Sequence, residues 1–117
     1  MKLIQEAVEV AKKADIVILA IGGNEQTSRE AWNNKHMGDR ANLELFGMQN
    51  DLIEAIHTTG KPIIATLING RPNSINFLKE KVPAILECWY LGQETGIAIA
   101  DVIFGDYNPS GKLPISL

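Results

Sequence analysis

Two patterns of apolar residues alternate along this chain. Continuous apolar runs predict buried strands, and apolar residues recurring every three or four positions predict helices with one stripe facing a core. The expected strands are Ile16–Ile21, Ile63–Ile68, Ala84–Trp89 and a short last one at Leu113–Leu117. The expected helices are Leu3–Lys13, one that starts near Phe46 and ends before Gly60, Asn73–Lys79 and Gln93–Phe104.

The alternation of helix and strand indicates an α/β fold. We expect a three-layer sandwich with a mostly parallel sheet of three to four strands, right-handed crossovers and helices on both faces. Ile16–Ile21 carries no charge on either face, which is typical of a strand that is covered on both sides. The 117 residues are enough for a single domain. A sheet this small suggests a piece of a larger domain.

Composition removes several classes of partner. The net charge is −3 and no basic stripe is visible, so nucleic acid is not an expected partner. No apolar run approaches the length of a transmembrane helix, so no membrane partner is expected either. The first residues do not form a signal peptide. A periplasmic or secreted parent cut down to this segment would look the same, so the compartment stays open.

The polar stretch Gly22–Arg40 is far longer than a link between a strand and a helix requires. Long loops in compact domains are usually functional or disordered, and this one contains glutamates, arginines, a histidine and a tryptophan. In an open α/β sheet, ligands bind outside the carboxyl ends of the strands. The stretch is therefore a candidate active-site loop.

Several residues of the chain also have simple structural explanations. Glu25 and Glu30 are the carboxyl candidates, although each taken alone fits a solvated loop residue. Asp39 and Arg40 fit a cap or a local ion pair that holds the end of the loop. His36 has no second histidine at ligand spacing, so we expect no metal site and no cofactor.

Other patterns have similar structural readings. Cys88 lies in an apolar run and fits a small buried side chain. The glycines after the first strand lack the spacing of a dinucleotide-binding motif. Asn69-Gly70-Arg71-Pro72 could position a ligand, but turn chemistry explains it fully. Trp89-Tyr90 could stack on a sugar face, but aromatic residues at the end of a strand are more often packing.

Several segments, in order, nevertheless carry a family likeness. The chain resembles the C-terminal α/β-sandwich domain of glycoside hydrolase family 3, the β-glucosidase and β-xylosidase group. Phe46, Leu91 and Thr95 depart from residues that are usual in that family, at turn positions. The matching segments are Ala14-Asp15-Ile16-Val17-Ile18-Leu19, Gly38-Asp39-Arg40 with Leu43, Leu45 and Gln49, Gly60-Lys61-Pro62, Asn69-Gly70-Arg71-Pro72, Pro83-Ala84-Ile85-Leu86-Glu87, Gly92-Gln93-Glu94 and Asn108-Pro109-Ser110-Gly111-Lys112-Leu113-Pro114.

The resemblance implies retaining hydrolysis of a β-linked glucoside or xyloside. It places the acid/base role on Glu30, with Glu25 as the next candidate, and makes Trp32 and Arg40 candidate substrate contacts. The family's nucleophile is an aspartate in a preceding barrel domain, which this chain lacks. The chain would therefore be part of a longer parent enzyme, with the barrel domain as its partner, and inactive by itself.

Two other functions remain open at this point. One is a non-catalytic α/β module that binds a nucleotide or another small ligand. The other is a structural domain of a hydrolase whose acid/base residue lies elsewhere.

Overall fold

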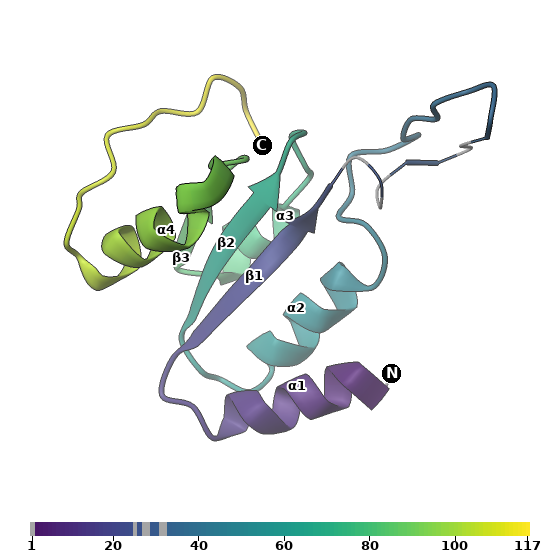
Figure 1. The fold of residues 1–117 in the computed structure, drawn as a ribbon. Coiled ribbons are helices and arrows are strands. Elements are labelled where there is room, and N and C mark those ends of the chain that lie inside the picture. The colour runs from purple at the N-terminus through teal and green to yellow at the C-terminus, as the bar shows by residue number, and fades with distance from the viewer. Residues whose placement is uncertain (1, 25, 27–28, 31–32) are drawn as a thin grey trace.

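The computed structural model describes residues 2–24, 26, 29–30 and 33–117. Its strands form a single parallel sheet in the order β1-β2-β3, with helices around it (Figure 1), which confirms the predicted sandwich. The strands are β1 (Val17–Gly23), β2 (Ile63–Asn69) and β3 (Ala84–Glu87). The helices are α1 (Lys2–Lys12), α2 (Gln49–His57), α3 (Asn76–Lys81) and α4 (Thr95–Phe104), with a short 3-10 turn, η1 (Gly92–Glu94), before α4.

The strand register brings the carboxyl ends of the strands together. Val17 of β1 lies opposite Ile63 of β2, and Gly23 lies opposite Asn69 at the other end of the pair. The last register pair of β2 and β3 joins Leu67 to Glu87. The long loop after β1 therefore leaves the sheet beside the turns that follow β2 and β3.

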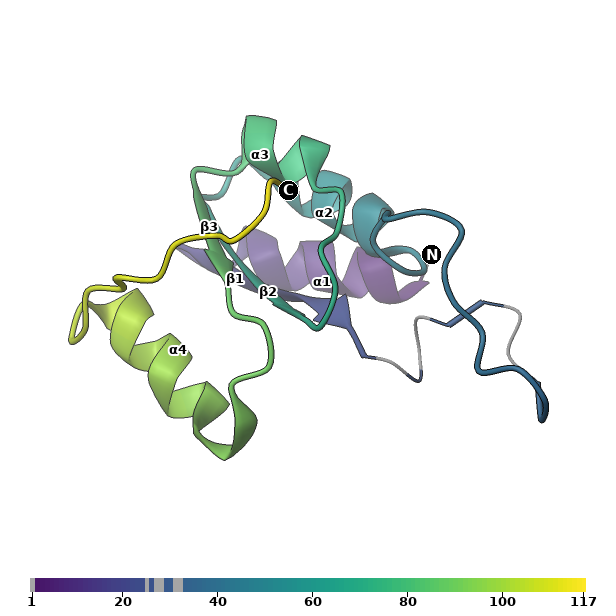
Figure 2. The ribbon, with the colours of Figure 1, turned by 90° about the horizontal axis from the view of Figure 1, so that it is seen from above.

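One face of the sheet holds the core. Helices α1, α2 and α3 all lie on this side (Figure 2), and right-handed crossovers between strands in the order β1-β2-β3 place α2 and α3 on the same face. Alternate residues of the strands point into the core because side chains alternate between the faces of a sheet. The buried core residues are Ala11, Leu19, Ile21, Leu45, Ile53, Ile56, Ile63, Ala65, Leu67, Ile75, Leu78 and Val82.

The other face of the sheet is only partly covered, so the prediction that the first strand is covered on both sides is wrong for this chain. Ile16 and Ile18 are 56% and 50% exposed. Helix α4 lies on this side of the sheet (Figure 2), but none of its residues is buried. Within the described residues, β1 also pairs with β2 alone, which leaves its outer edge unpaired. The apolar run Ile16–Ile21 thus correctly predicted burial on the core face of β1, but not on the opposite face.

The strand expected at Leu113–Leu117 is also wrong. In the part of the chain that the structure describes, these residues join no sheet. Pro114 has no N–H to donate to a ladder, which disfavours pairing there. The segment instead runs back from α4 across the sheet (Figure 2) and packs Leu117 against the core. Its apolar residues therefore signal packing and not strand pairing.

Candidate active site

Glu30 lies in the loop that follows β1 and is held by the segment just after position 38. Its backbone N–H donates to the oxygen of Asp39 at 3.0 Å, and the N–H of Asp39 donates back to the oxygen of Glu30 at 3.1 Å. Its Oε2 accepts a hydrogen bond of 3.0 Å from the N–H of Ala41. Its Oε1 lies 3.9 Å from Nη2 of Arg40, and 46% of the Glu30 side chain stays exposed. The carboxylate is thus oriented and yet accessible from outside.

Arg40 turns its side chain back onto the loop. Its Nη2 donates to Oδ1 of Asn42 at 2.9 Å, and its Nε donates to the oxygen of Asn42 at 3.3 Å. Only 12% of the Arg40 side chain is exposed. This guanidinium therefore already has partners within the loop, and its role as a substrate contact stays a prediction.

Asp39 pairs with a residue of the neighbouring turn. Its Oδ1 accepts a hydrogen bond from Nη1 of Arg71, which lies 32 positions further along the chain, and another of 2.7 Å from the N–H of Arg40. The hydrogen bond from Arg71 is the main cause that holds the pKa of the Asp39 carboxyl below its usual range, followed by that from the Arg40 N–H. The expected ion pair at the end of the loop thus involves Arg71 and not the side chain of Arg40.

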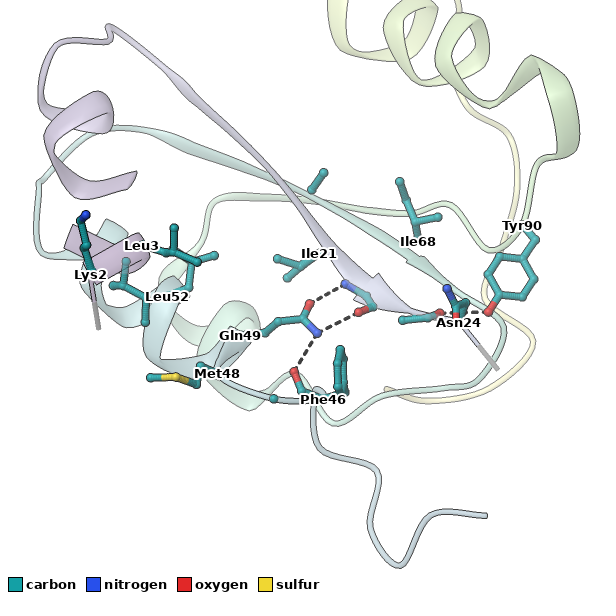
Figure 3. A pocket seen from close by; sticks show the side chains of 15 residues that line it. Lys2, Leu3, Ile21, Asn24, Phe46, Met48, Gln49, Leu52, Ile68 and Tyr90 are labelled. Carbon is teal, nitrogen blue, oxygen red and sulfur yellow. Dashed lines mark hydrogen bonds between the residues drawn. The ribbon is translucent and has the colours of Figure 1, made fainter. Parts of the chain in front are cut away.

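The start of the loop is fixed by Gln49, the first residue of α2. Its Oε1 accepts from the N–H of Gly22 at 2.7 Å, and its Nε2 donates to the oxygen of Gly22 at 2.8 Å (Figure 3). The same Nε2 also donates to the oxygen of Phe46 at 2.8 Å. One amide side chain therefore satisfies both backbone groups where β1 ends, and the N–H of Gly22 already has a partner.

Tyr90, which follows β3, contacts Gly23, the last residue of β1. Its hydroxyl donates to the oxygen of Gly23 at 2.9 Å (Figure 3). Its ring lies against Gly70 so closely that a Cβ atom there would meet the ring at 2.4 Å. The packing explanation of this aromatic residue is confirmed by the contact with Gly70, and stacking on a sugar stays a prediction.

Asn69 at the end of β2 is buried, and Glu87 at the end of β3 is partly buried. Oε1 of Glu87 accepts from the N–H of Trp89 at 3.2 Å, and Trp89 adopts a positive φ of 53°. Oε2 of Glu87 and Oδ1 of Asn69 are both buried without a hydrogen-bond partner. Burial raises the pKa of the Glu87 carboxyl, and the hydrogen bond from the Trp89 N–H opposes that shift only in part.

An apolar groove of about 850 Å³ runs beside the open edge of β1, between the ends of α1 and α2. Leu3, Met48, Leu52 and Ile68 line it (Figure 3). Glu30 is not among the residues that line this groove. The groove therefore is not a sugar pocket built around the candidate acid.

The remaining predicted residues have different outcomes. Glu25 and Trp32 lie outside the described residues, so both stay predictions. Cys88 is buried, as expected, and burial is the main cause that raises the pKa of its thiol. His36 accepts a hydrogen bond from the N–H of Gly38 at its Nδ1, at 2.9 Å. In the described residues, no group of three or more His, Cys, Asp or Glu side chains could hold a metal ion.

Sequence reasoning missed the contacts that hold the loop. Gln49 and Glu87 were not singled out as part of a site, and Asn69 and Arg71 were assigned to turn chemistry. Their common signal is position, because each follows or faces the carboxyl end of one of the three adjacent strands.

In the described chain, no helix is long and apolar enough to cross a membrane.

Comparison with known proteins assigns the chain to a family. The family model for the "Glycosyl hydrolase family 3 C-terminal domain" matches residues 1–117. A β-xylosidase from Formosa agariphila is 53% identical over 111 residues, which are 95% of this chain and 14% of that protein. A periplasmic β-glucosidase from Salmonella typhimurium is 47% identical over 114 residues, which are 97% of this chain and 14% of that protein.

Solved structures agree with the sequence relatives. A β-glucosidase from Erythrobacter marinus superposes with a TM-score of 0.86 at 50% identity, over 97% of this chain and 15% of that one. A β-glucosidase from Kluyveromyces marxianus in complex with glucose has a TM-score of 0.80 at 34% identity, over 96% of this chain and 13% of that one. The chain thus spans about one seventh of the length of these relatives. With a whole-length match to the family model and relatives well above 30% identity, the chain belongs to the glycoside hydrolase family 3 C-terminal domains.

Proposed function

We propose that this chain supplies the acid/base residue, Glu30, to a longer retaining β-glycosidase that acts on β-linked glucosides or xylosides. The observation that carries the proposal is that the Glu30 carboxylate is both oriented and exposed. The Ala41 N–H orients it at 3.0 Å, and 46% of the side chain stays exposed. A general acid has to combine a fixed position with access for the substrate. The names of the relatives, β-xylosidase and β-glucosidase, supply the substrate class.

The chemistry assigns one of two carboxyl groups to this chain. A nucleophilic carboxylate on the barrel domain of the parent attacks the anomeric carbon, while Glu30 protonates the leaving oxygen. Glu30 then removes a proton from the water that hydrolyses the glycosyl-enzyme intermediate. Retaining enzymes hold the two carboxyl groups about 5 Å apart. The loop therefore has to meet the barrel domain at a defined position.

Replacement of Glu30 in the longer enzyme tests this role. Glu30→Ala should lower kcat by about a hundredfold to ten-thousandfold on alkyl glycosides, the range of general acid–base catalysis. The loss should be smaller on aryl glycosides whose leaving groups need no proton. Azide should partly restore activity because it attacks the glycosyl-enzyme without a general base.

A second loop glutamate provides the control. The Glu44 carboxylate accepts a hydrogen bond of 3.1 Å from Nδ2 of Asn50 on α2, so Glu44→Ala should retain normal turnover. Near-normal turnover of Glu30→Ala on an alkyl glycoside would rule out the acid/base role. A severe defect in Glu25→Ala would then move the role to Glu25.

The two other functions make different predictions. A nucleotide module would offer the backbone N–H groups after β1 to a phosphate, but Gln49 already occupies that of Gly22. A thermal-shift screen should therefore show no stabilisation by nucleotides. A purely structural domain would tolerate Glu30→Ala, so the experiment above separates it from the proposed function.

A further inference from the structure

We propose that Asp39 and Arg71 are a pair of positioning residues that fix Glu30 for proton transfer. The inference rests on the proposed acid/base role of Glu30 and adds to it. The pair joins the segment that holds Glu30 to the turn at the carboxyl end of β2.

The first step of the argument is where Glu30 obtains its position. Two backbone hydrogen bonds, one carboxylate hydrogen bond and one ion pair join it to the three residues 39–41. β1 ends at Gly23, seven residues before Glu30. The segment 39–41 therefore acts as the platform on which the carboxylate is oriented.

The second step is how the platform reaches the sheet. Nη1 of Arg71 donates to Oδ1 of Asp39. The backbone oxygen of Arg71 in turn accepts from Nδ2 of Asn69 at 2.5 Å. Asn69 is the last residue of β2 and only 2% exposed. A continuous series of contacts thus runs from the buried end of β2 through Arg71 and Asp39 to Glu30.

The third step is what this pair contributes. Its side chains are 37% exposed for Arg71 and 74% exposed for Asp39. Ion pairs as exposed as this contribute little to the stability of a fold. A contribution to stability therefore does not explain the pair well. In catalysis, by contrast, a displacement of about 1 Å can cost on the order of a hundredfold in rate.

A second surface ion pair of this chain, between Lys12 and Glu9, can serve as a control for the pair of Asp39 and Arg71. Nζ of Lys12 lies 2.8 Å from Oε1 of Glu9 on α1, and their side chains are 55% and 58% exposed. This pair joins two neighbouring turns of one helix, α1. Glu9→Gln therefore removes a similar surface ion pair with no expected effect on Glu30.

The test measures kcat and KM of the longer enzyme for Asp39→Asn, Arg71→Gln, Glu9→Gln and Glu30→Ala. Asp39→Asn and Arg71→Gln should each lower kcat on alkyl glycosides by about ten- to a hundredfold. KM should change less than about threefold, and the midpoint of thermal unfolding should stay close to that of Glu9→Gln. The loss should shrink on aryl glycosides with good leaving groups, because these depend less on the acid. A merely structural pair would show no dependence on the leaving group.

Exchanging the charges of Asp39 and Arg71 provides a second test of the pair. The double variant Asp39→Arg/Arg71→Asp should recover at least about fivefold in kcat over the worse single exchange, since it restores the contact between the two turns. If Asp39→Asn fails to fold, Arg71→Gln removes the same contact from the other side.

The outcomes separate the two proposals. If Glu30→Ala is active on alkyl glycosides, the acid/base assignment fails. If Glu30→Ala is inactive but Asp39→Asn and Arg71→Gln behave like Glu9→Gln, the positioning inference alone is overturned.

Discussion

The hydroxyl of Tyr90 donates a hydrogen bond of 2.9 Å to the backbone oxygen of Gly23, 67 positions earlier in the chain. The ring that carries this hydroxyl rests directly on Gly70. The ends of all three strands thus meet at one aromatic side chain. This contact has a simple steric requirement, namely that position 70 has no side chain.

Gly70→Ala should therefore destabilise the protein through Tyr90. A Cβ atom at position 70 would lie 2.4 Å from Cε2 of the ring, so the ring has to move and the hydrogen bond to Gly23 is lost. We expect a loss of about 1–2 kcal/mol in the free energy of unfolding. In a Tyr90→Ala background the same substitution should cost almost nothing. A double-mutant cycle by urea unfolding measures the difference, and equal costs in both backgrounds would contradict this explanation.

Gly22→Ala should be far more damaging. Gly22 has a φ of 134°, and an added Cβ atom would lie 2.1 Å from the backbone oxygen of Ile68. Because this neighbour is backbone of β2 and cannot move away, we expect a loss of more than about 3 kcal/mol. Gly96→Ala is the control, since no heavy atom lies within 4 Å of the added Cβ on α4. That variant should gain roughly 0.5–1 kcal/mol. Thermal unfolding of the two variants should shift in opposite directions.

Glu87 should make the stability of the fold depend on pH. Its folded pKa is raised above the unfolded value of 4.5, so the folded state binds the proton more strongly. Its favourable contribution is complete below that unfolded pKa and is lost as the pH rises through the folded pKa. The stability of the natural protein relative to Glu87→Gln should thus fall as the pH is raised above 4.5. A constant difference across urea titrations in this range would contradict the raised pKa.

The 117-residue chain alone should hydrolyse no glycoside. A retaining mechanism needs two carboxyl groups on opposite sides of one bond, and the proposal places only one of them here. The purified chain should be incubated with aryl β-glucosides and β-xylosides next to a Glu30→Gln control, which reveals contaminating host enzyme. Turnover well above that control would mean that the chain holds a complete site, and the assignment as part of a larger enzyme would fail.

The fold could be predicted from the sequence to the extent that local patterns determine it. The apolar runs identified β1, β2 and β3 because buried parallel strands need no polar face. The same rule failed at Leu113–Leu117, where apolar residues pack without pairing. It also failed for Ile18, since an apolar side chain shows that a cover is favourable but not where the cover comes from.

The candidate site was less predictable than the fold. Family likeness selected Glu30, and the structure adds the contacts that orient it. The pairing of Asp39 with Arg71 could not be predicted, because the two residues are 32 positions apart and each has an adequate local explanation. Such pairs become visible only when the strand order is known, since it decides which turns lie side by side.

The partly covered face of the sheet limits how this segment can be used in enzyme engineering. Ile18 of β1 and Ile16 just before that strand offer apolar surface, and in the described residues the outer edge of β1 is also unpaired. Such edges promote association between chains. A chimaera that exchanges these 117 residues between two glycosidases would carry this apolar surface and this open edge into its new context. Unless the new context covers them, the chimaera should associate or aggregate more readily than either starting enzyme.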